Sequence, residues 1–204
     1  MTSLAVIFIL LLCASWNNVA VARKGELNTI VAELRKQLED FRKAGVEVQT
    51  DPKDPLALVI IIPEDLLVFA VGKDSIPEKG KTFLREFITK LAKITLSENL
   101  RDKIHGIIVE GHADKSGTDE INLPLSQRRS MSVVTESLNV LEGDGRSEFI
   151  KLLSASGRGS VEPYVEPVYH QEVPDKSRRV VFKIRMRSFE QKDFQTIIGT
   201  AANS

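Results

Sequence analysis

The stretch that decides the fold is residues 107–138, which read IIVEGHADKSGTDEINLPLSQRRSMSVVTESL. Ile107–Val109 is a short apolar run of β-branched residues before Gly111, which predicts a buried strand ending near this glycine. Residues 123–141 repeat apolar side chains at helical spacing, and we expect one face of this helix to meet the core. The apolar residues expected on that face are Met131, Val134, Leu138 and Leu141.

Polar side chains gather where this strand gives way to the helix. Asp114 follows the strand, and Asn122, Ser126 and Arg129 fall at i, i+4 and i+7, so they share one helix face. Pro124 is best tolerated in a first turn, which predicts a helix start near residue 123. A ligand carboxylate would then meet free N–H groups and the Arg129 guanidinium, and an ammonium would go to Asp114. The pattern predicts a small, zwitterionic, amino-acid-like ligand.

The same residues resemble the peptidoglycan-binding motif of OmpA-like domains, also found in the stator subunit MotB. That motif is Gly-His-Thr-Asp, followed by Asn-x-x-Leu-Ser-x-x-Arg-Ala. This chain has Gly111-His112-Ala113-Asp114 and then 122–130, with Ala113 and Ser130 departing from the pattern by small residues. The similarity covers roughly residues 45–187. It implies an α/β fold of the OmpA C-terminal type, a mixed β-sheet packed with two main helices.

The resemblance also implies which residues hold the ligand, the diaminopimelate of the peptidoglycan stem peptide. Asp114 and Arg129 would hold it directly, with Asn122 assisting. Ser177–Phe182 is similar to the family's Asn-Arg-Arg-Val-Glu-Phe, which implies that Arg178 is a third contact. Alternatively, Arg178 braces the last strand by an ion pair to Asp114. The full set of implied peptidoglycan-binding residues is Asp114, Asn122, Leu125, Ser126, Arg129 and Arg178.

The amino-terminal residues 1–22 carry no charged side chain, and Leu4–Leu12 is wholly apolar. A helix needs about 20 apolar residues to cross a bilayer. Two interpretations compete: an uncleaved transmembrane helix, or a signal peptide ending in Ala20–Ala22. Arg23 and Lys24 follow on the side that the positive-inside rule would keep in the cytoplasm, which speaks against the anchor.

Met1–Ala5 resembles the start of the MotB membrane helix, Asp-x-Met-Thr-Ala, in which the Asp carries the ion. That Asp would lie two residues before Met1, so we expect the protein to begin upstream with an acidic residue. The resemblance implies a stator-type inner-membrane subunit with a periplasmic domain and a MotA-like channel partner. Subunits of this type include the B subunit of the Zorya anti-phage system. The alternative is a secreted or tethered structural protein that links membrane and cell wall without ion-motor activity.

Residues 23–44 are predicted to form a spacer helix with one apolar stripe. The stripe steps by 4, 3, 4 and 3 residues, which is heptad spacing over only two heptads. The helix either is a spacer that is solvated or packs on its own domain, or forms the coiled-coil seam of a homodimer. The residues of the stripe are Leu27, Val31, Leu34, Leu38 and Phe41.

The rest of the chain supplies further elements of the 45–187 domain. Residues 46–49 and 56–62 predict a hairpin, and Ser75–Glu78 is a capping box that opens a helix. Gly157–Gly159 resembles a turn of the family, and residues 163–174 are predicted to form a surface loop. Residues 182–187 alternate between apolar and charged side chains, which predicts a half-buried strand, and residues 188–204 are predicted to be a tail. The core side of the helix after the capping box is expected to carry Leu84, Phe87, Leu91 and Ile94.

Composition and spacing argue against several functions. Lysines plus arginines and aspartates plus glutamates number 28 each, so nothing indicates a nucleic-acid partner. Cys13, the single cysteine, lies in the apolar leader. His105 and His112 are seven residues apart and do not match metal-ligand spacings. No serine or cysteine has an evident base partner, so we expect no catalysis, no cofactor and no metal.

Overall fold

The structure, a computed structural model, describes residues 2–187, without the side chains of residues 2–4, 14–24, 26 and 27. Its helices are α1 (Thr2–Gln37), α2 (Glu39–Lys43), α3 (Glu64–Leu67), α4 (Glu78–Thr95), α5 (Asp119–Val140), α6 (Gly143–Leu152) and α7 (Pro174–Ser177). Its strands are β1 (Glu47–Thr50), β2 (Ala57–Pro63), β3 (Ile104–His112), β4 (Leu153–Gly159) and β5 (Arg179–Met186). The predicted tail, residues 188–204, lies outside the described part.

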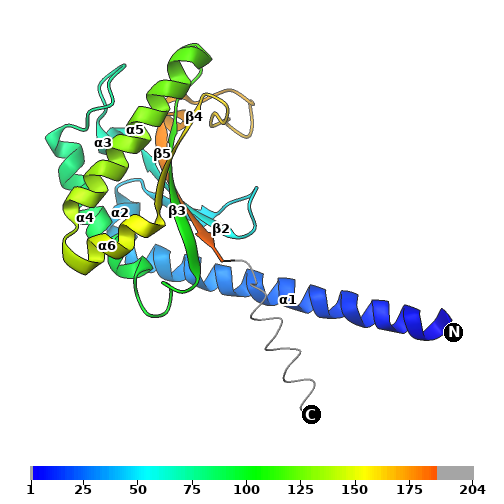
Figure 1. The fold of residues 1–204 in the computed structure, drawn as a ribbon. Helices are drawn as coiled ribbons and strands as arrows, with labels where there is room; N and C mark the ends of the chain where they lie inside the picture. Colours follow the sequence, from blue (N-terminus) through cyan, green and yellow to red (C-terminus); the bar gives the residue numbers. More distant parts are fainter. Residues whose placement is uncertain (1, 188–204) are drawn as a thin grey trace.

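The last strand in sequence, β5, is the centre of a sheet with the order β1-β2-β5-β3-β4. It pairs antiparallel with β2 and with β3, and β1 pairs antiparallel with β2. β3 and β4 are parallel, so the chain must cross over between them, which it does through α5 and α6. Figure 1 shows α4, α5 and α6 on one face of the sheet. The predicted mixed α/β sheet with two main helices, α4 and α5, is confirmed.

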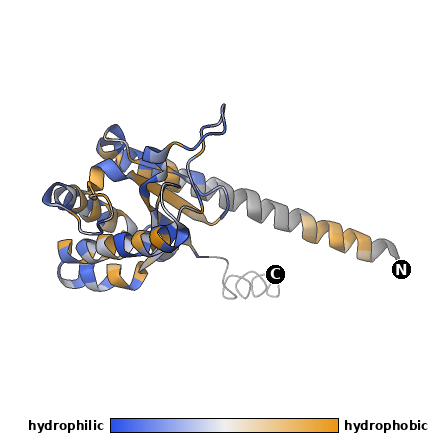
Figure 2. Cartoon of the chain, turned by 90° about the horizontal axis from the view of Figure 1, so that it is seen from above, coloured by the Kyte–Doolittle hydropathy of each residue, from blue (hydrophilic) through white to orange (hydrophobic). Residues whose placement is uncertain are grey.

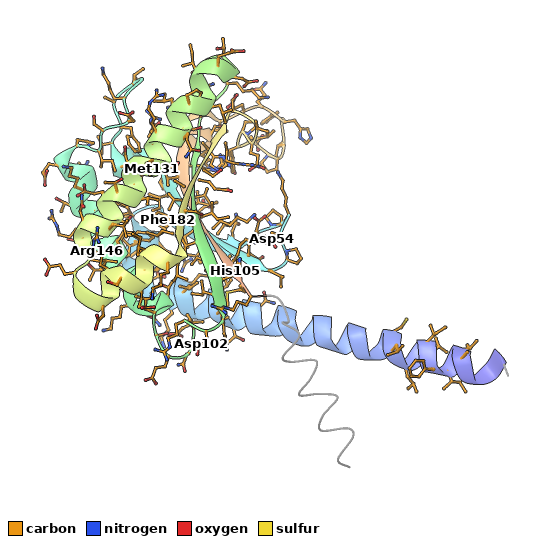
Figure 3. The ribbon with its side chains drawn as sticks, viewed as in Figure 1. Asp54, Asp102, His105, Met131, Arg146 and Phe182 are labelled. Atoms are coloured by element: carbon orange, nitrogen blue, oxygen red, sulfur yellow. The ribbon has the colours of Figure 1, made fainter. Side chains whose placement is uncertain are left out.

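Aromatic rings join the sheet to the helices in the core. The ring of Phe182 on β5, labelled in Figure 3, lies 5.4 Å from that of Phe87 on α4, centroid to centroid. Phe87 also contacts Phe41 of α2 at 5.5 Å, in an edge-to-face arrangement that aromatic pairs favour. The apolar face predicted for α4 is confirmed, because its four residues are all buried: Leu84, Phe87, Leu91 and Ile94.

The apolar stripe of the spacer helix packs on the chain's own domain. Val31, Leu34 and Leu38 are buried in the same core as the sheet. The Nε of Arg35 donates a hydrogen bond of 2.8 Å to the carbonyl oxygen of Val48 and thereby ties α1 to β1. The structure therefore shows the spacer helix packed on its own domain over these residues, which was one of the alternatives. Over residues 31–38 the stripe is therefore covered and does not face a second copy.

The amino-terminal part of α1 extends away from the domain, and Figure 2 colours part of it as hydrophobic. The side chains of Val6–Leu12 are exposed. Within the described residues, no helix is both long and apolar enough to cross a bilayer. The membrane helix or signal peptide predicted over residues 1–22 falls partly outside the described residues, because residue 1 and the side chains of 2–4 and 14–22 are not included.

Helix α5 begins earlier than predicted. Its first residue is Asp119, and Pro124 lies inside it as the sixth residue. The first turn forms ahead of the proline, because the N–H groups of Ile121 and Asn122 both donate to the carbonyl oxygen of Thr118. Arg129 thus lies three turns into the helix, about 15 Å along its axis from the first residue. The prediction that free N–H groups of the helix start lie beside Arg129 was wrong.

Three smaller predictions also need correction. No side chain caps α4, and Ser75 lies two residues before the N-cap residue Pro77, so the predicted capping box does not form. Met131 is half exposed, because it lies about 200° around the helix from the buried Arg129. Gly157–Gly159, predicted as a turn, belongs to β4 and pairs with β3.

Glycines on the sheet let α5 lie directly against the strands. A Cβ at Gly111 would lie 2.2 Å from the carbonyl oxygen of Ser126, and one at Gly157 would lie 2.6 Å from the backbone nitrogen of Gln127. The facing side of α5 is also small, and its hydroxyls donate to carbonyl oxygens of their own helix. The buried serines on that side are Ser126, Ser130 and Ser137.

Candidate functional site

The candidate site lies at the edge of the sheet where β2 and β3 end and β5 begins. In the register of the three strands, Arg179 of β5 is flanked by Pro63 of β2 and His112 of β3. Residues just beyond this row therefore meet at one edge, although they come from distant parts of the chain. With Arg129 of α5 they form what we call the edge cluster: Glu64, Asp114, Arg129 and Arg178.

Asp114 is a buried carboxylate held by hydrogen bonds. Both the hydroxyl and the backbone N–H of Ser116 donate to its Oδ1, and Nη1 of Arg178 forms an ion pair with its Oδ2. Burial by itself raises the pKa of Asp114, but the hydrogen bonds from Ser116 and the ion pair with Arg178 outweigh it and leave the pKa below its usual value. The carboxyl is therefore ionised at neutral pH.

Asn122 and Ser126 hold the loop and the neighbouring strand in place. The Nδ2 of Asn122 donates to the carbonyl oxygens of Asp114 and Gly117, each at 3.0 Å. The hydroxyl of Ser126 accepts a hydrogen bond of 2.9 Å from the N–H of Gly159 on β4. The predicted common face of α5 is confirmed, since both side chains and Arg129 are buried.

Arg129 is fixed by the loop between α3 and α4. Its Nε donates to the carbonyl oxygen of Lys73 at 2.9 Å and its Nη2 to that of Ala70 at 3.2 Å. The guanidinium carbon lies 4.8 Å from the ring centroid of Phe69, within cation–π range. Its Nη1 forms an ion pair of 2.6 Å with Oε1 of Glu64. Only 9% of the Arg129 side chain is exposed, so its guanidinium is held in place by these contacts.

Arg178 is the more accessible arginine, with 35% of its side chain exposed. It forms ion pairs with three acids: with Glu64 through Nε at 2.8 Å, with Asp114 through Nη1, and with Asp175 through Nη2. The alternative in which Arg178 pairs with Asp114 is therefore observed. The pairing does not conflict with ligand binding, because Arg178 has spare donors and partial exposure.

Sequence reasoning placed three of the four members of the edge cluster and missed Glu64. Glu64 is the first residue after the buried strand β2, and an acid directly after a buried strand is the only signal that pointed to it. Leu125, also predicted for the site, is half-buried on α5 between Asn122 and Arg129.

His112 lies beneath the edge cluster, buried at the end of β3. Burial lowers its pKa, although Glu110, whose Oε2 lies 3.8 Å from Nε2, opposes this shift. Neither ring nitrogen has a hydrogen-bond partner among the described residues. His112 lines a void of about 10 Å³ together with residues that include Glu64 and Arg129. A void of this size holds about one water molecule.

The sheet order and the parallel crossover define a fold of the OmpA/MotB type. Among solved structures, the periplasmic domain of Helicobacter pylori MotB is similar, with a TM-score of 0.54 and 19% identity over 78% of this chain and 94% of that chain. A protein from Desulfovibrio vulgaris described as MotB-like gives a TM-score of 0.59 and 17% identity, over 84% and 98% of the two chains. The cell wall anchor of the T6SS from Pseudomonas aeruginosa gives 0.52 and 23%, over 76% and 97%.

Comparison of the sequence with protein-family models and with curated proteins found no match. The similarity therefore lies in the fold, at identities below 25%. It confirms the OmpA/MotB-like fold that the motif resemblance predicted.

Proposed function

We propose that the chain binds peptidoglycan non-covalently by holding the diaminopimelate of the stem peptide at the edge cluster. The observation that carries this proposal is the convergence of Asp114 with Arg129 and Arg178 at one sheet edge. A diaminopimelate end carries an ammonium and a carboxylate on the same carbon, so it needs an acid and a guanidinium side by side. The T6SS cell wall anchor, which has the same fold, gives further support.

The charges of the edge cluster fit such a ligand. The ligand ammonium goes to the ionised carboxylate of Asp114, and the ligand carboxylate goes to Arg178 and Arg129. Both arginines and the aspartate already have partners within the protein, so binding exchanges one set of ion pairs for another and gains less than each contact alone. Asn122 and Ser126 act by positioning the loop of Asp114 and the strand β4. The role is binding without catalysis.

The binding domain would fix an inner-membrane complex to the cell wall from the periplasm. The exposed apolar side chains of α1 support insertion of residues 1–22 into a bilayer, since Val6–Leu12 are each 45–64% exposed. A stator-type role with a MotA-like channel subunit, in a flagellar or a Zorya-like system, rests on the resemblance of residues 1–5. A homodimer belongs to the same proposal, and it would have to use a surface other than the covered stripe of residues 31–38.

Co-sedimentation with diaminopimelate-type sacculi tests the proposal, using the full chain in mild detergent. Loss of one charge-assisted hydrogen bond costs about 1.5 to 3 kcal/mol, so Asp114→Asn should weaken binding about 10-fold to 150-fold. The matched control is Asp51→Asn, because Asp51 is also a mostly buried carboxylate in an ion pair, with Lys183 at 2.5 Å. If Asp114→Asn sediments like the wild type while both variants are folded, the site assignment is wrong.

A further inference from the structure

Glu64 occupies the place that a ligand carboxylate would take. Its Oε1 lies 2.6 Å from Nη1 of Arg129 and its Oε2 lies 2.8 Å from Nε of Arg178. One carboxylate thus bridges the two guanidinium groups, with one oxygen on each. This is the geometry expected of a bound carboxylate between two arginines.

Arg129 offers a ligand little other than the nitrogen that Glu64 holds. Its Nε and Nη2 are directed at backbone carbonyl oxygens of the 70–73 loop, and its guanidinium packs on Phe69. The void beside it has only about 10 Å³, too little for a second carboxylate next to Glu64. A ligand carboxylate can therefore reach Arg129 only when Glu64 moves away.

The Glu64 side chain can leave at limited cost. Arg178 keeps two other acids, Asp114 and Asp175, and Arg129 keeps its two carbonyl acceptors. The backbone of Glu64 stays fixed, because its N–H donates to the carbonyl oxygen of Arg178 and its own carbonyl oxygen accepts from Val68. Only the side chain has to rotate, and 17% of it is already exposed.

We propose that Glu64 is an intramolecular competitor for the ligand's carboxylate and thereby determines which carboxyl state of the ligand the site accepts. This inference rests on the proposed binding of diaminopimelate. In the wild-type chain a free ligand carboxylate must displace Glu64 to reach Arg129, so the gain from its charge there is largely cancelled. A ligand whose carboxyl is amidated leaves Glu64 in place and binds through its ammonium to Asp114. The wild-type site therefore discriminates weakly between free and amidated diaminopimelate.

The test is calorimetric titration of the full chain with two probes. One is the L-Ala-γ-D-Glu-diaminopimelate tripeptide, and the other is the same tripeptide with the diaminopimelate carboxyl on the far, amine-bearing carbon amidated. Glu64→Gln keeps the shape of the side chain and an oxygen acceptor but removes its charge. It should tighten binding of the free-carboxyl tripeptide about tenfold, the value of one charge-assisted hydrogen bond, and leave the amidated tripeptide unchanged.

The matched control is Asp54→Asn at the opposite end of β2. Asp54 is likewise an acid between two cations, Lys183 at 3.9 Å and Arg185 at 3.0 Å, and 19% of its side chain is exposed. It should change neither affinity. Glu64→Ala serves as a second variant, and thermal unfolding shows that each variant is folded.

The outcomes separate this inference from the proposed function. If Glu64→Gln binds the free-carboxyl tripeptide as the wild type does, or more weakly, while Asp114→Asn loses binding, then Glu64 is not a competitor and the proposed function stands. If Asp114→Asn also binds both tripeptides like the wild type, the proposed function is wrong and the inference fails with it.

Discussion

The close approach of α5 to β3 makes Gly111 the most sensitive glycine for the position of the site. In Gly111→Ala the new Cβ would lie 2.2 Å from the carbonyl oxygen of Ser126 and 3.0 Å from its carbonyl carbon. Both are backbone atoms, so no side chain can rotate away. Ordinary contact needs at least about 3.4 Å between such atoms, so α5 has to withdraw from the sheet by about 1 Å.

That withdrawal has a cost that can be worked out. Overpacking of a core position costs about 1 to 3 kcal/mol. The shift would also stretch the hydrogen bond of 2.9 Å between the N–H of Gly159 and the hydroxyl of Ser126, which adds about 1 kcal/mol. Gly111→Ala should therefore lower the free energy of unfolding by about 2 to 4 kcal/mol. It should also weaken sacculus binding in conditions where the variant is still folded, because α5 carries Arg129.

Gly106→Ala on the same strand is the control. A Cβ there would meet only the carbonyl oxygen of Leu152 at 3.4 Å, an ordinary contact. Removing a glycine from the unfolded chain stabilises by about 0.4 to 1 kcal/mol where the backbone is compatible, so this variant should be neutral or slightly more stable. Urea denaturation of both variants gives the comparison. Equal unfolding free energies for Gly111→Ala and Gly106→Ala would refute the argument that direct backbone contact sets the position of α5.

Two further predictions concern stability. The hydrogen bond from Lys53 lowers the pKa of Glu162 to about 2; burial opposes this shift, and the hydrogen bond from Arg158 adds to it. Glu162 therefore stabilises the fold above pH 4.5, and this contribution is lost as the pH falls toward 2. Glu162→Gln should lose about 1 to 3 kcal/mol at pH 7, and its denaturation midpoint should converge with that of the wild type near pH 2; a difference that persists there would contradict the assignment. Leu34→Ala should lower the free energy of unfolding by about 2 to 5 kcal/mol, because Leu34 is 2% exposed in the domain's own core. The control Lys36→Ala should be neutral. An unchanged denaturation midpoint for Leu34→Ala would mean that α1 does not pack on the domain.

The sequence predicted elements whose patterns are local. The apolar run of β2, the helical spacing of α4 and the alternation of β5 each follow from side chains that repeat with the period of their own element. The shared face of Asn122, Ser126 and Arg129 on α5 also followed from their spacing along one helix. These patterns need no knowledge of the topology.

The parts that sequence reasoning missed depend on contacts between elements. Glu64 meets Arg129 and Arg178 only because β2, β5 and α5 end at one edge, which no spacing along the chain reveals. The burial of Ser130 and Ser137 on α5 was not predicted, because small serines whose hydroxyls donate to their own helix give no apolar signal. The heptad stripe of α1 fitted a partner helix and the chain's own core equally well, since both bury the same spacing.

The central claim is that Asp114 holds the ammonium of a diaminopimelate end. The most direct measurement is calorimetric titration of the wild-type chain with the diaminopimelate tripeptide, with the amine on the far carbon of the residue either free or acetylated. Acetylation removes the charge that faces Asp114 and should weaken binding at least about tenfold, as expected for a lost charge-assisted hydrogen bond. Equal affinity for both tripeptides, or no saturable binding of either, would contradict the account.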